Sequence, residues 1–237
     1  MRDDIYKEKM DISKFTFDQK VVDVFEDMVL RSVPGYKQMI ELIGVAGRTF
    51  PVINSNVYDL GCSTGAVTLS ISSNLKSNSI KIFSIDNSQE MLDQCRRNLS
   101  GIEANIQYTC DDIENIQFEN ASLIVLNLTL QFIKPKNRSK LVKKMYESLL
   151  PGGALFISEK IIHENKEINK SLISLHESFK RENGYSETEI SQKRRALEEV
   201  LIPESIEQHL KRLNKAGFKK PLVQMQCLNF ASILAQK

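Results

Sequence analysis

Short continuous runs of apolar residues alternate with segments whose apolar residues recur at helical spacing, and this alternation fills the middle of the chain. Continuous apolar runs are typical of buried parallel strands, whereas a recurrence every three to four residues is typical of helices. The predicted strands are 57–60, 80–85, 106–108, 121–127 and 154–159. The predicted helices between them are 66–75, 89–99 and 135–150. Strands that alternate with helices predict a mostly parallel sheet with right-handed crossover connections.

The segments on either side of this core follow a different pattern. Helical spacing at 21–30 and 37–50 is separated by Pro34-Gly35, which predicts a turn between two helices that cover the core. The charged segment 162–199 is also helical in pattern, and a minimal doubly wound fold has no need of it. A break at 183–186 divides it, and a helix at 206–216 with two strands at 223–227 and 230–234 closes the chain.

We therefore expect a single α/β domain in four parts. The parts are an N-terminal arm and helical cover (1–52), a core that binds the cofactor (53–160), a helical insertion (161–200), and a last helix with closing strands (201–237).

One turn in the core has the composition of a ligand-binding loop. The stretch Asp59-x-Gly61-x-Ser63-x-Gly65 follows an apolar strand and precedes a helix. Glycine allows the tight bend, and the helix that follows presents free N–H groups at the carboxyl end of the strand. The next strand ends in Asp86, about 20 residues on, the distance at which nucleotide-binding folds place an acid on ribose hydroxyls. This unit predicts a nucleoside cofactor site.

Composition narrows the classes of function. The chain has 237 residues, of which 41% are hydrophobic, enough for one large domain. Its 32 basic and 30 acidic residues give a net charge of +2, which argues against a protein built mainly to bind nucleic acid. Four scattered cysteines predict reduced thiols rather than a zinc site. A charged N-terminus and the lack of a long apolar run predict a cytoplasmic protein, and we expect no metal.

The arrangement of acids and glycines resembles the class I S-adenosylmethionine-dependent methyltransferases. In that class an acid precedes the glycines of the first turn, an acid ends the second strand, and an acid after the third contacts adenine. The turn at 151–153 and the late stretch 216–218 are also similar to that class. The resemblance implies a Rossmann-like fold with a seven-stranded sheet and helices on both faces.

A closer resemblance is carried by the blocks 31–36, 58–63, 85–88, 125–132, 179–186 and 189–194. Together they are similar to the carboxy-S-adenosyl-L-methionine synthase family over nearly the whole chain. The stretch 183–194 is the specific part, because ordinary methyltransferases do not share it.

The resemblance implies an unusual reaction. The family carboxylates the methyl group of S-adenosylmethionine, taking the carboxyl group from prephenate and releasing phenylpyruvate. The product, carboxy-S-adenosylmethionine, is used by a separate tRNA carboxymethyltransferase to make 5-oxyacetyluridine at the wobble position. The resemblance also implies a homodimer that binds neither nucleic acid nor a membrane directly.

The same resemblance assigns the ligand-binding residues. They are Tyr36, Gly61, Cys62, Ser63, Asp86, Asn87, Asp112, Ile113, Asn127 and Arg194. Gly61, Cys62 and Ser63 would hold the amino acid part of the cofactor, and Asp86 and Asn87 its ribose. Asp112 and Ile113 would contact adenine, although by chemistry alone Asp111 competes with Asp112.

Arg194 is the residue on which specificity depends. A guanidinium binds a carboxylate through two parallel hydrogen bonds, so Arg194 suits the carboxyl group that the reaction adds. Composition alone favours a solvated charge within 193–195, and the neighbouring Arg195 departs from the family pattern.

No general base stands out, and we assign none of His163, His176 and His209 a catalytic role. The resemblance implies that the methyl proton leaves to a carboxylate of the substrate, and that the resulting ylide captures carbon dioxide. Two other functions stay open: a conventional methyltransferase acting on a small molecule or tRNA, and a binding module that has kept the cofactor fold.

Overall fold

The computed structural model describes residues 1–8 and 15–237, and residues 9–14 of the expected N-terminal arm lie outside the described residues. Its strands are β1 (Asn56–Leu60), β2 (Lys81–Asp86), β3 (Asn105–Cys110), β4 (Ala121–Asn127), β5 (Leu149–Ile162), β6 (Glu204–Ser205), β7 (Lys219–Cys227) and β8 (Phe230–Gln236). The helices are α1 (Gln19–Ser32), α2 (Tyr36–Thr49), α3 (Ala66–Ser72), α4 (Gln89–Asn98), the 3-10 turn η1 (Leu130–Phe132), α5 (Pro135–Ser148), α6 (Lys166–Glu182), α7 (Glu187–Leu197) and α8 (Ile206–Ala216).

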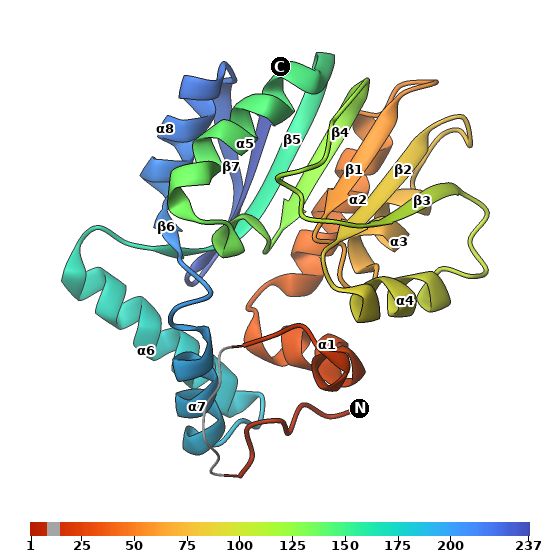
Figure 1. Cartoon of the computed structure of the whole chain (residues 1–237). Coiled ribbons are helices and arrows are strands. Elements are labelled where there is room, and N and C mark those ends of the chain that lie inside the picture. The colour runs from red at the N-terminus through yellow and green to blue at the C-terminus, as the bar shows by residue number, and fades with distance from the viewer. Residues whose placement is uncertain (9–14) are drawn as a thin grey trace.

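The sheet has the strand order β3-β2-β1-β4-β5-β8-β7 (Figure 1). The five strands from β3 to β5 pair in parallel, and β8 runs antiparallel to both β5 and β7. The predicted Rossmann-like fold with a mostly parallel seven-stranded sheet is therefore confirmed. The short strand β6 adds an eighth, paired with the end of β5.

Both faces of the sheet are covered by helices, which is why β4 is apolar throughout. Leu123 and Val125 belong to the apolar cluster that α2 and α3 complete. Ile124 and Leu126 belong to the cluster on the opposite face, completed by α5 and α8. Side chains alternate across a strand, so a strand buried on both faces needs an unbroken apolar run.

Strand β5 begins five residues earlier than the predicted 154–159. Leu149 pairs with Ala121, the register then shifts, and Ala154 pairs with Leu123. The intervening stretch 150–153 contains Pro151-Gly152-Gly153, which bulges relative to β4 but stays extended, with Gly152 and Gly153 hydrogen-bonded to the backbone of Lys237. The predicted helix 135–150 ends at Ser148, and the predicted turn at 151–153 is an irregularity inside the strand.

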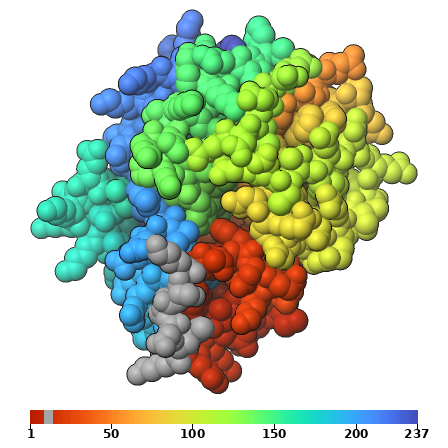
Figure 2. Space-filling model, in the orientation of Figure 1, coloured from red at the N-terminus to blue at the C-terminus, as the bar shows by residue number. Residues whose placement is uncertain are grey.

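Three helices gather beyond the carboxyl ends of the central strands, and we call α1, α6 and α7 the helical cover (Figure 1). Asn165 caps α6 through its side chain, and Ser186 with Glu189 forms a capping box that starts α7. Between them Gly184 takes a φ of 81°, a conformation suited to glycine at the end of a helix. Figure 2 shows the N-terminal segment (red) against the light-blue segment that includes α7.

Candidate functional site

The loop after β1 is held in a left-handed conformation at three positions. Gly61, Ser63 and Gly65 have φ values of 75°, 48° and 93°. A Cβ on Gly61 would lie 2.5 Å from the Thr129 side chain, so a close neighbour as well as the backbone angle excludes a side chain there. Ser63 therefore adopts the conformation that a glycine would favour, at some cost in backbone strain.

Asp86 connects the end of β2 to this loop. Its Oδ2 accepts a hydrogen bond from the backbone N–H of Ser63 at 2.9 Å, and its Oδ1 accepts one from the N–H of Ser88 at 3.0 Å. The N-cap of α4 is Ser88, whose hydroxyl accepts from Met91, so the carboxylate is not needed as the cap. Burial raises the pKa of Asp86, and the N–H donors oppose that shift. The carboxylate lies at the cavity wall, where its remaining lone pairs suit ribose hydroxyls.

The loop after β3 brings Asp111, Asp112 and Ile113 to the same cavity. The Oδ1 of Asp111 accepts from Asp112 N–H and from the Asn115 amide, and the Oδ1 of Asp112 accepts from Glu114 N–H. Both carboxylates are exposed and both line the cavity, so the geometry leaves the choice between them open. Ile113 is buried beside them.

Two polar atoms near the centre of the sheet are buried without a hydrogen-bond partner among the described residues. They are Oδ1 of Asn127, at the end of β4, and Oδ1 of Asp59 in β1. The other oxygen of Asp59 accepts from the Thr68 hydroxyl at 2.6 Å. Burial raises the pKa of Asp59 to about 7, partly opposed by Thr68 and reinforced by Asp86. Unsatisfied buried acceptors are rare, and a ligand that donates hydrogen bonds would satisfy Asn127, which lines the cavity.

These loops border one cavity of about 530 Å³, which we call the main cavity. Its volume lies in the roughly 300–1,000 Å³ range of small-molecule sites. It is lined by nine of the ten predicted ligand residues, all but Arg194. Tyr36, the first residue of α2, is also part of the wall, and burial raises its pKa above the usual range. Their roles in binding stay predictions.

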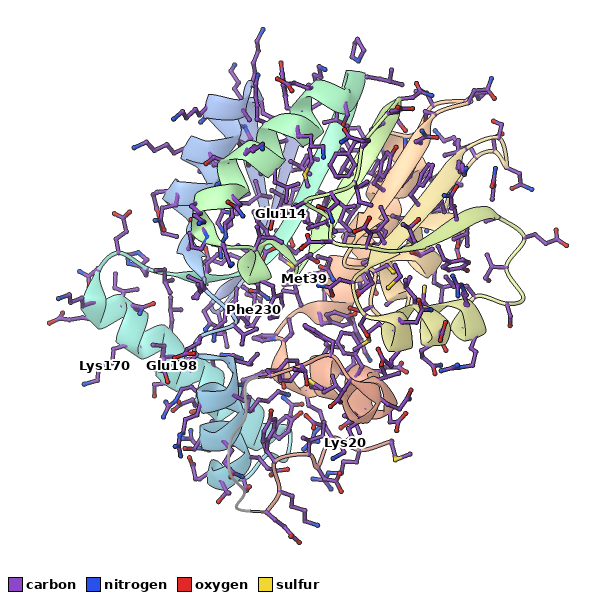
Figure 3. All side chains as sticks on the ribbon, in the orientation of Figure 1. Lys20, Met39, Glu114, Lys170, Glu198 and Phe230 are labelled. Atoms are coloured by element: carbon purple, nitrogen blue, oxygen red, sulfur yellow. The ribbon has the colours of Figure 1, made fainter. Side chains whose placement is uncertain are left out.

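The side of the main cavity that faces the helical cover is largely apolar. Phe15 and Phe17 from the N-terminal arm line the cavity and stack edge to face with centroids 5.1 Å apart. Phe25 and Met28 of α1 and Phe230 of β8 line it as well. Figure 3 shows Phe230 between the sheet and the helical cover. The polar strand ends and this apolar part of the cavity wall together suit a nucleoside, which has a polar sugar and a flat aromatic base.

The opposite end of the main cavity is basic, and the sequence did not reveal this. Lys160 of β5, Lys180 of α6 and Lys193 of α7 all line it. Burial lowers the pKa of each lysine, and for Lys180 the additional repulsion from Lys160 and Lys193 brings the pKa to about 7. Nothing in the periodicity marks Lys180 and Lys193, because in a charged helix a lysine that lines a cavity has the same pattern as a solvated one.

His176 lies among these lysines and is neutral. Its Nε2–H donates to the carbonyl oxygen of Ser32 at 2.8 Å, and its Nδ1 accepts from the Asn229 amide at 3.3 Å. Burial and the neighbouring lysines lower its pKa to about 3. The sequence assigned His176 no catalytic role, and the structure places it in the cavity wall.

Arg194 lies outside the main cavity in this structure. Its side chain is 63% exposed and forms an ion pair with Glu177 at 2.8 Å. It borders a smaller adjoining pocket of about 150 Å³, which also has Lys160, His176 and Lys180 in its wall. Arg194 is therefore next to the basic end of the main cavity, separated from it by the residues that both pockets share.

Among the described residues no group of three or more His, Cys, Asp or Glu side chains is placed to hold a metal ion. In that same part of the chain, no helix combines the length and the apolar character that crossing a membrane requires. Cys62 and Cys95 are buried and free beside the glycine loop.

The sequence is similar to that of known S-adenosylmethionine-dependent enzymes. The family model described as a methyltransferase domain matches residues 57–153. A carboxy-S-adenosyl-L-methionine synthase of Ruthia magnifica subsp. Calyptogena magnifica is 48% identical over 237 residues, covering 100% of both chains. The enzyme of that name from Shewanella sediminis is 49% identical over 239 residues, covering 100% of this chain and 98% of the relative.

Solved structures show the same fold at low sequence identity. Human N-acetylserotonin methyltransferase, in complex with S-adenosylmethionine, superposes with a TM-score of 0.62 at 18% identity, covering 92% of this chain and 55% of that one. A putative S-adenosylmethionine-dependent methyltransferase of Methanococcus maripaludis gives a TM-score of 0.59 at 20% identity and covers 97% of both chains. With the full-length identity to the curated relatives, the chain belongs to the carboxy-S-adenosyl-L-methionine synthase family of S-adenosylmethionine-dependent transferases.

Proposed function

We propose that this protein carboxylates the methyl group of S-adenosylmethionine, with prephenate as the carboxyl donor. The observation that carries the proposal is the two-ended main cavity, which has carboxylates at the strand ends and three lysines under the helical cover. A methyl transferase for a neutral acceptor has no need of buried cations beside the cofactor, whereas a reaction between two carboxylated molecules does.

The chemistry balances without an added oxidant or reductant. S-Adenosylmethionine supplies an activated methyl carbon, and prephenate supplies carbon dioxide and a hydroxide as its ring becomes aromatic. The proton lost from the methyl group and the hydroxide form water, and a new carbon–carbon bond joins the methyl carbon to carbon dioxide. In this scheme the protein contributes positioning and electrostatic stabilisation rather than a general base.

The chain's own residues divide the task between the two ends. Asp86 and Asn87 would hold the ribose of S-adenosylmethionine, and Asp112 and Ile113 would contact its adenine. The loop at Gly61 would hold its amino acid part. Arg194 would exchange Glu177 for the carboxyl group of the product, because a bidentate guanidinium–carboxylate pair is stronger than an exposed ion pair. We further propose that the protein acts in the cytoplasm as a homodimer and that its product passes to a separate tRNA carboxymethyltransferase. We expect that the protein binds neither nucleic acid nor a membrane directly.

Mass spectrometry of one reaction tests the proposal. Purified protein is incubated with S-adenosylmethionine and prephenate, and we expect carboxy-S-adenosylmethionine and phenylpyruvate in equal amounts. A reaction without prephenate is the control. If S-adenosylmethionine binds but no carboxylated product appears, the conventional methyltransferase becomes the better hypothesis.

A further inference from the structure

The positive charges at the basic end of the main cavity are compensated unequally. The ammonium of Lys193 forms an ion pair with Asp3 at 3.0 Å, and Arg194 forms one with Glu177. Within the part of the chain that the structure describes, neither Lys160 nor Lys180 forms an ion pair through its ammonium. Two of the four cations therefore lack a direct counter-ion.

The other residues around these two lysines do not supply a counter-ion either. Lys160 and Lys180 line both the main cavity and the adjoining pocket, together with neutral His176. Glu177 acts on both lysines at a distance, but its carboxylate is already bound to Arg194. Taking a charge out of water costs several kcal/mol when no partner replaces the hydration. A pair of such cations in one wall destabilises the empty protein, and an anionic ligand would remove that cost.

The other charges of the cavity show where the anion belongs. The carboxylates of the cavity wall lie at two strand ends. Asp86 is the last residue of β2, and Asp111, Asp112 and Glu114 follow β3. The nucleoside lies at those strand ends in the proposed function. Lys160, in contrast, is near the end of β5, and Lys180 is near the end of α6. The second molecule of the reaction therefore has the basic end available.

The basic end also has apolar walls. Phe230 lies edge to face against the His176 ring, with centroids 5.2 Å apart, and Leu197 and Leu201 line both pockets. Cations next to an aromatic and aliphatic surface suit a compact molecule that combines a hydrocarbon ring with carboxylates. A free phosphate or sulfate would use the cations and leave the apolar wall without a partner.

From this juxtaposition we infer that Lys160 and Lys180 together form the binding site for a ring-bearing dicarboxylate, the carboxyl-donating substrate. This inference deepens the proposed function and depends on it for the identity of the donor. The shared chemistry, a carboxylate on a lysine pair, could also come from the amino acid end of the cofactor. The test below separates these two sources.

Isothermal titration calorimetry of prephenate is the direct test. The protein is first saturated with S-adenosylhomocysteine, which has no transferable methyl group, so binding is measured without reaction. We expect Lys160→Met and Lys180→Met each to weaken prephenate binding about tenfold or more, because a truncated charge pair loses its electrostatic contribution. Lys180→Arg should recover most of the affinity. The affinity for S-adenosylhomocysteine should stay within about twofold in every variant.

Lys170→Met is the matched control, because Lys170 is an exposed lysine of the same helix α6 (Figure 3). It should bind prephenate as the wild type does. Unchanged prephenate affinity in both cavity variants overturns the inference. An equal loss of prephenate and S-adenosylhomocysteine affinity also overturns it, because the lysines would then serve the cofactor.

A second readout needs no variant. Lys160 of β5, Lys193 and Arg194 of α7, and Glu177 and His176 of α6 all face Lys180 or act on it. At about pH 8 the Lys180 amine is mostly neutral in the empty site, since its pKa is about 7, and an anion would raise that pKa. Prephenate binding should therefore take up protons, seen as a difference between heats measured in Tris and in HEPES buffer. Proton uptake that Lys180→Arg abolishes supports the inference even if the methionine variants fail to fold, whereas uptake that persists unchanged in Lys180→Arg overturns it.

The failure of this inference differs from the failure of the proposed function. Phenylsuccinate, a stable ring-bearing dicarboxylate, is titrated alongside prephenate for that reason. Binding of either dianion through the two lysines without any carboxylated product overturns the reaction and supports the site. Formation of the product with wild-type prephenate affinity in both methionine variants overturns the site and supports the reaction. A wild type that binds neither dianion overturns the site as well.

Discussion

The two ends of the main cavity are held by different kinds of interaction. One end of the cavity contains Asp86, and we call it the nucleoside end because the proposed function places the nucleoside there. The strands of one continuous βαβ unit fix the positions of its side chains, and backbone N–H groups donate to the carboxylate of Asp86. At the basic end, side chains distant in sequence hold one another, as when Lys193 pairs with Asp3 across 190 positions. The nucleoside end is thus preorganised by the sheet, whereas the basic end depends on a few buried polar contacts.

The difference has a consequence for stability. Backbone hydrogen bonds of the sheet survive most single substitutions, because removing one side chain leaves the strands paired. A buried charge that loses its partner is left without compensation, and that loss destabilises the fold strongly. We therefore expect mutations that break the buried Asp3–Lys193 pair at the basic end to act on folding, and mutations at the nucleoside end to act mainly on binding.

The largest effect is expected from Asp3→Ala. The carboxylate of Asp3 is nearly inaccessible, and it accepts hydrogen bonds from the ammonium of Lys193 and from the Tyr185 hydroxyl. Its loss leaves a buried cation and a buried hydroxyl without their acceptor, so we expect the free energy of unfolding to fall by about 3 kcal/mol. Urea denaturation followed by circular dichroism measures this change.

Asp4→Ala is the control, since Asp4 is the adjacent acid and is exposed. It should change the free energy of unfolding by less than about 0.5 kcal/mol. Adding Lys193→Met to Asp3→Ala should restore part of the lost stability. Equal stability of the Asp3 and Asp4 variants would contradict the view that buried side-chain pairs hold the basic end.

Gly61→Ala comes next and tests the nucleoside end. A residue with a side chain at a φ of 75° costs about 1–2 kcal/mol, and the added Cβ would press on Thr129. Because the loop must shift, we expect S-adenosylmethionine to bind about tenfold more weakly. Calorimetry measures the affinity, and thermal denaturation measures the stability.

Gly101→Ala is its matched control, because nothing lies within 4 Å of a Cβ placed there. It should leave both the affinity and the stability unchanged. Wild-type affinity in Gly61→Ala would show that the loop is less rigid than the sheet around it implies.

The sequence led to the residues that line the cavity at the strand ends for a physical reason, although their roles in binding stay predictions. Glycine at a left-handed position, an acid at the end of a strand and a continuous apolar run each have a local cause that leaves a local pattern. Gly61, Asp86 and the seven-stranded order were accessible in this way, with the family resemblance supplying residues such as Asn127. The bulge at 150–153 was missed because it depends on the register of a neighbouring strand.

The basic end could not be predicted in the same way. Whether Lys180 is solvated or lines a cavity depends on how α6 packs against α1 and α7, which is a tertiary property. Asp3, in an arm of polar composition, gave no local sign that its carboxylate would be buried with Lys193. The resemblance did bring Arg194 to attention, and the structure locates it beside the main cavity rather than in it.

Arg194→Ala tests a residue that lies next to the basic end, outside the main cavity. If its guanidinium binds the added carboxyl group, the preference for carboxy-S-adenosylmethionine over S-adenosylmethionine should fall about tenfold, since one charge-assisted pair is lost. Stability should change little, because the ion pair with Glu177 is exposed. Competition calorimetry with the two ligands measures the preference.

Arg195→Ala is the control for this experiment, because Arg195 is an exposed arginine next in the same helix. Its preference should match the wild type. Glu177→Gln should raise the preference, because it releases Arg194 from its present partner. An unchanged preference in Arg194→Ala would remove Arg194 from the proposed site.

The last expected effect is a pH dependence of stability that originates at Lys180. Burial, with repulsion from Lys160 and Lys193, lowers its pKa in the folded protein from 10.5 to about 7. Between those values the unfolded chain binds a proton that the folded protein does not. The free energy of unfolding should therefore rise from about pH 7 to about pH 10, by at most about 1.4 kcal/mol per pH unit, and this contribution is constant below about pH 7.

Lys180→Met removes that contribution. Urea denaturation at about pH 7 and about pH 9 should show the wild type gaining stability relative to Lys180→Met as the pH rises, whereas Lys170→Met should follow the wild type. Saturating prephenate should flatten the wild-type difference, because a bound anion restores the charged form of the lysine. Parallel behaviour of wild type and Lys180→Met at both pH values would mean that Lys180 is hydrated in solution, and the two ends of the cavity would then be less different than their contacts indicate.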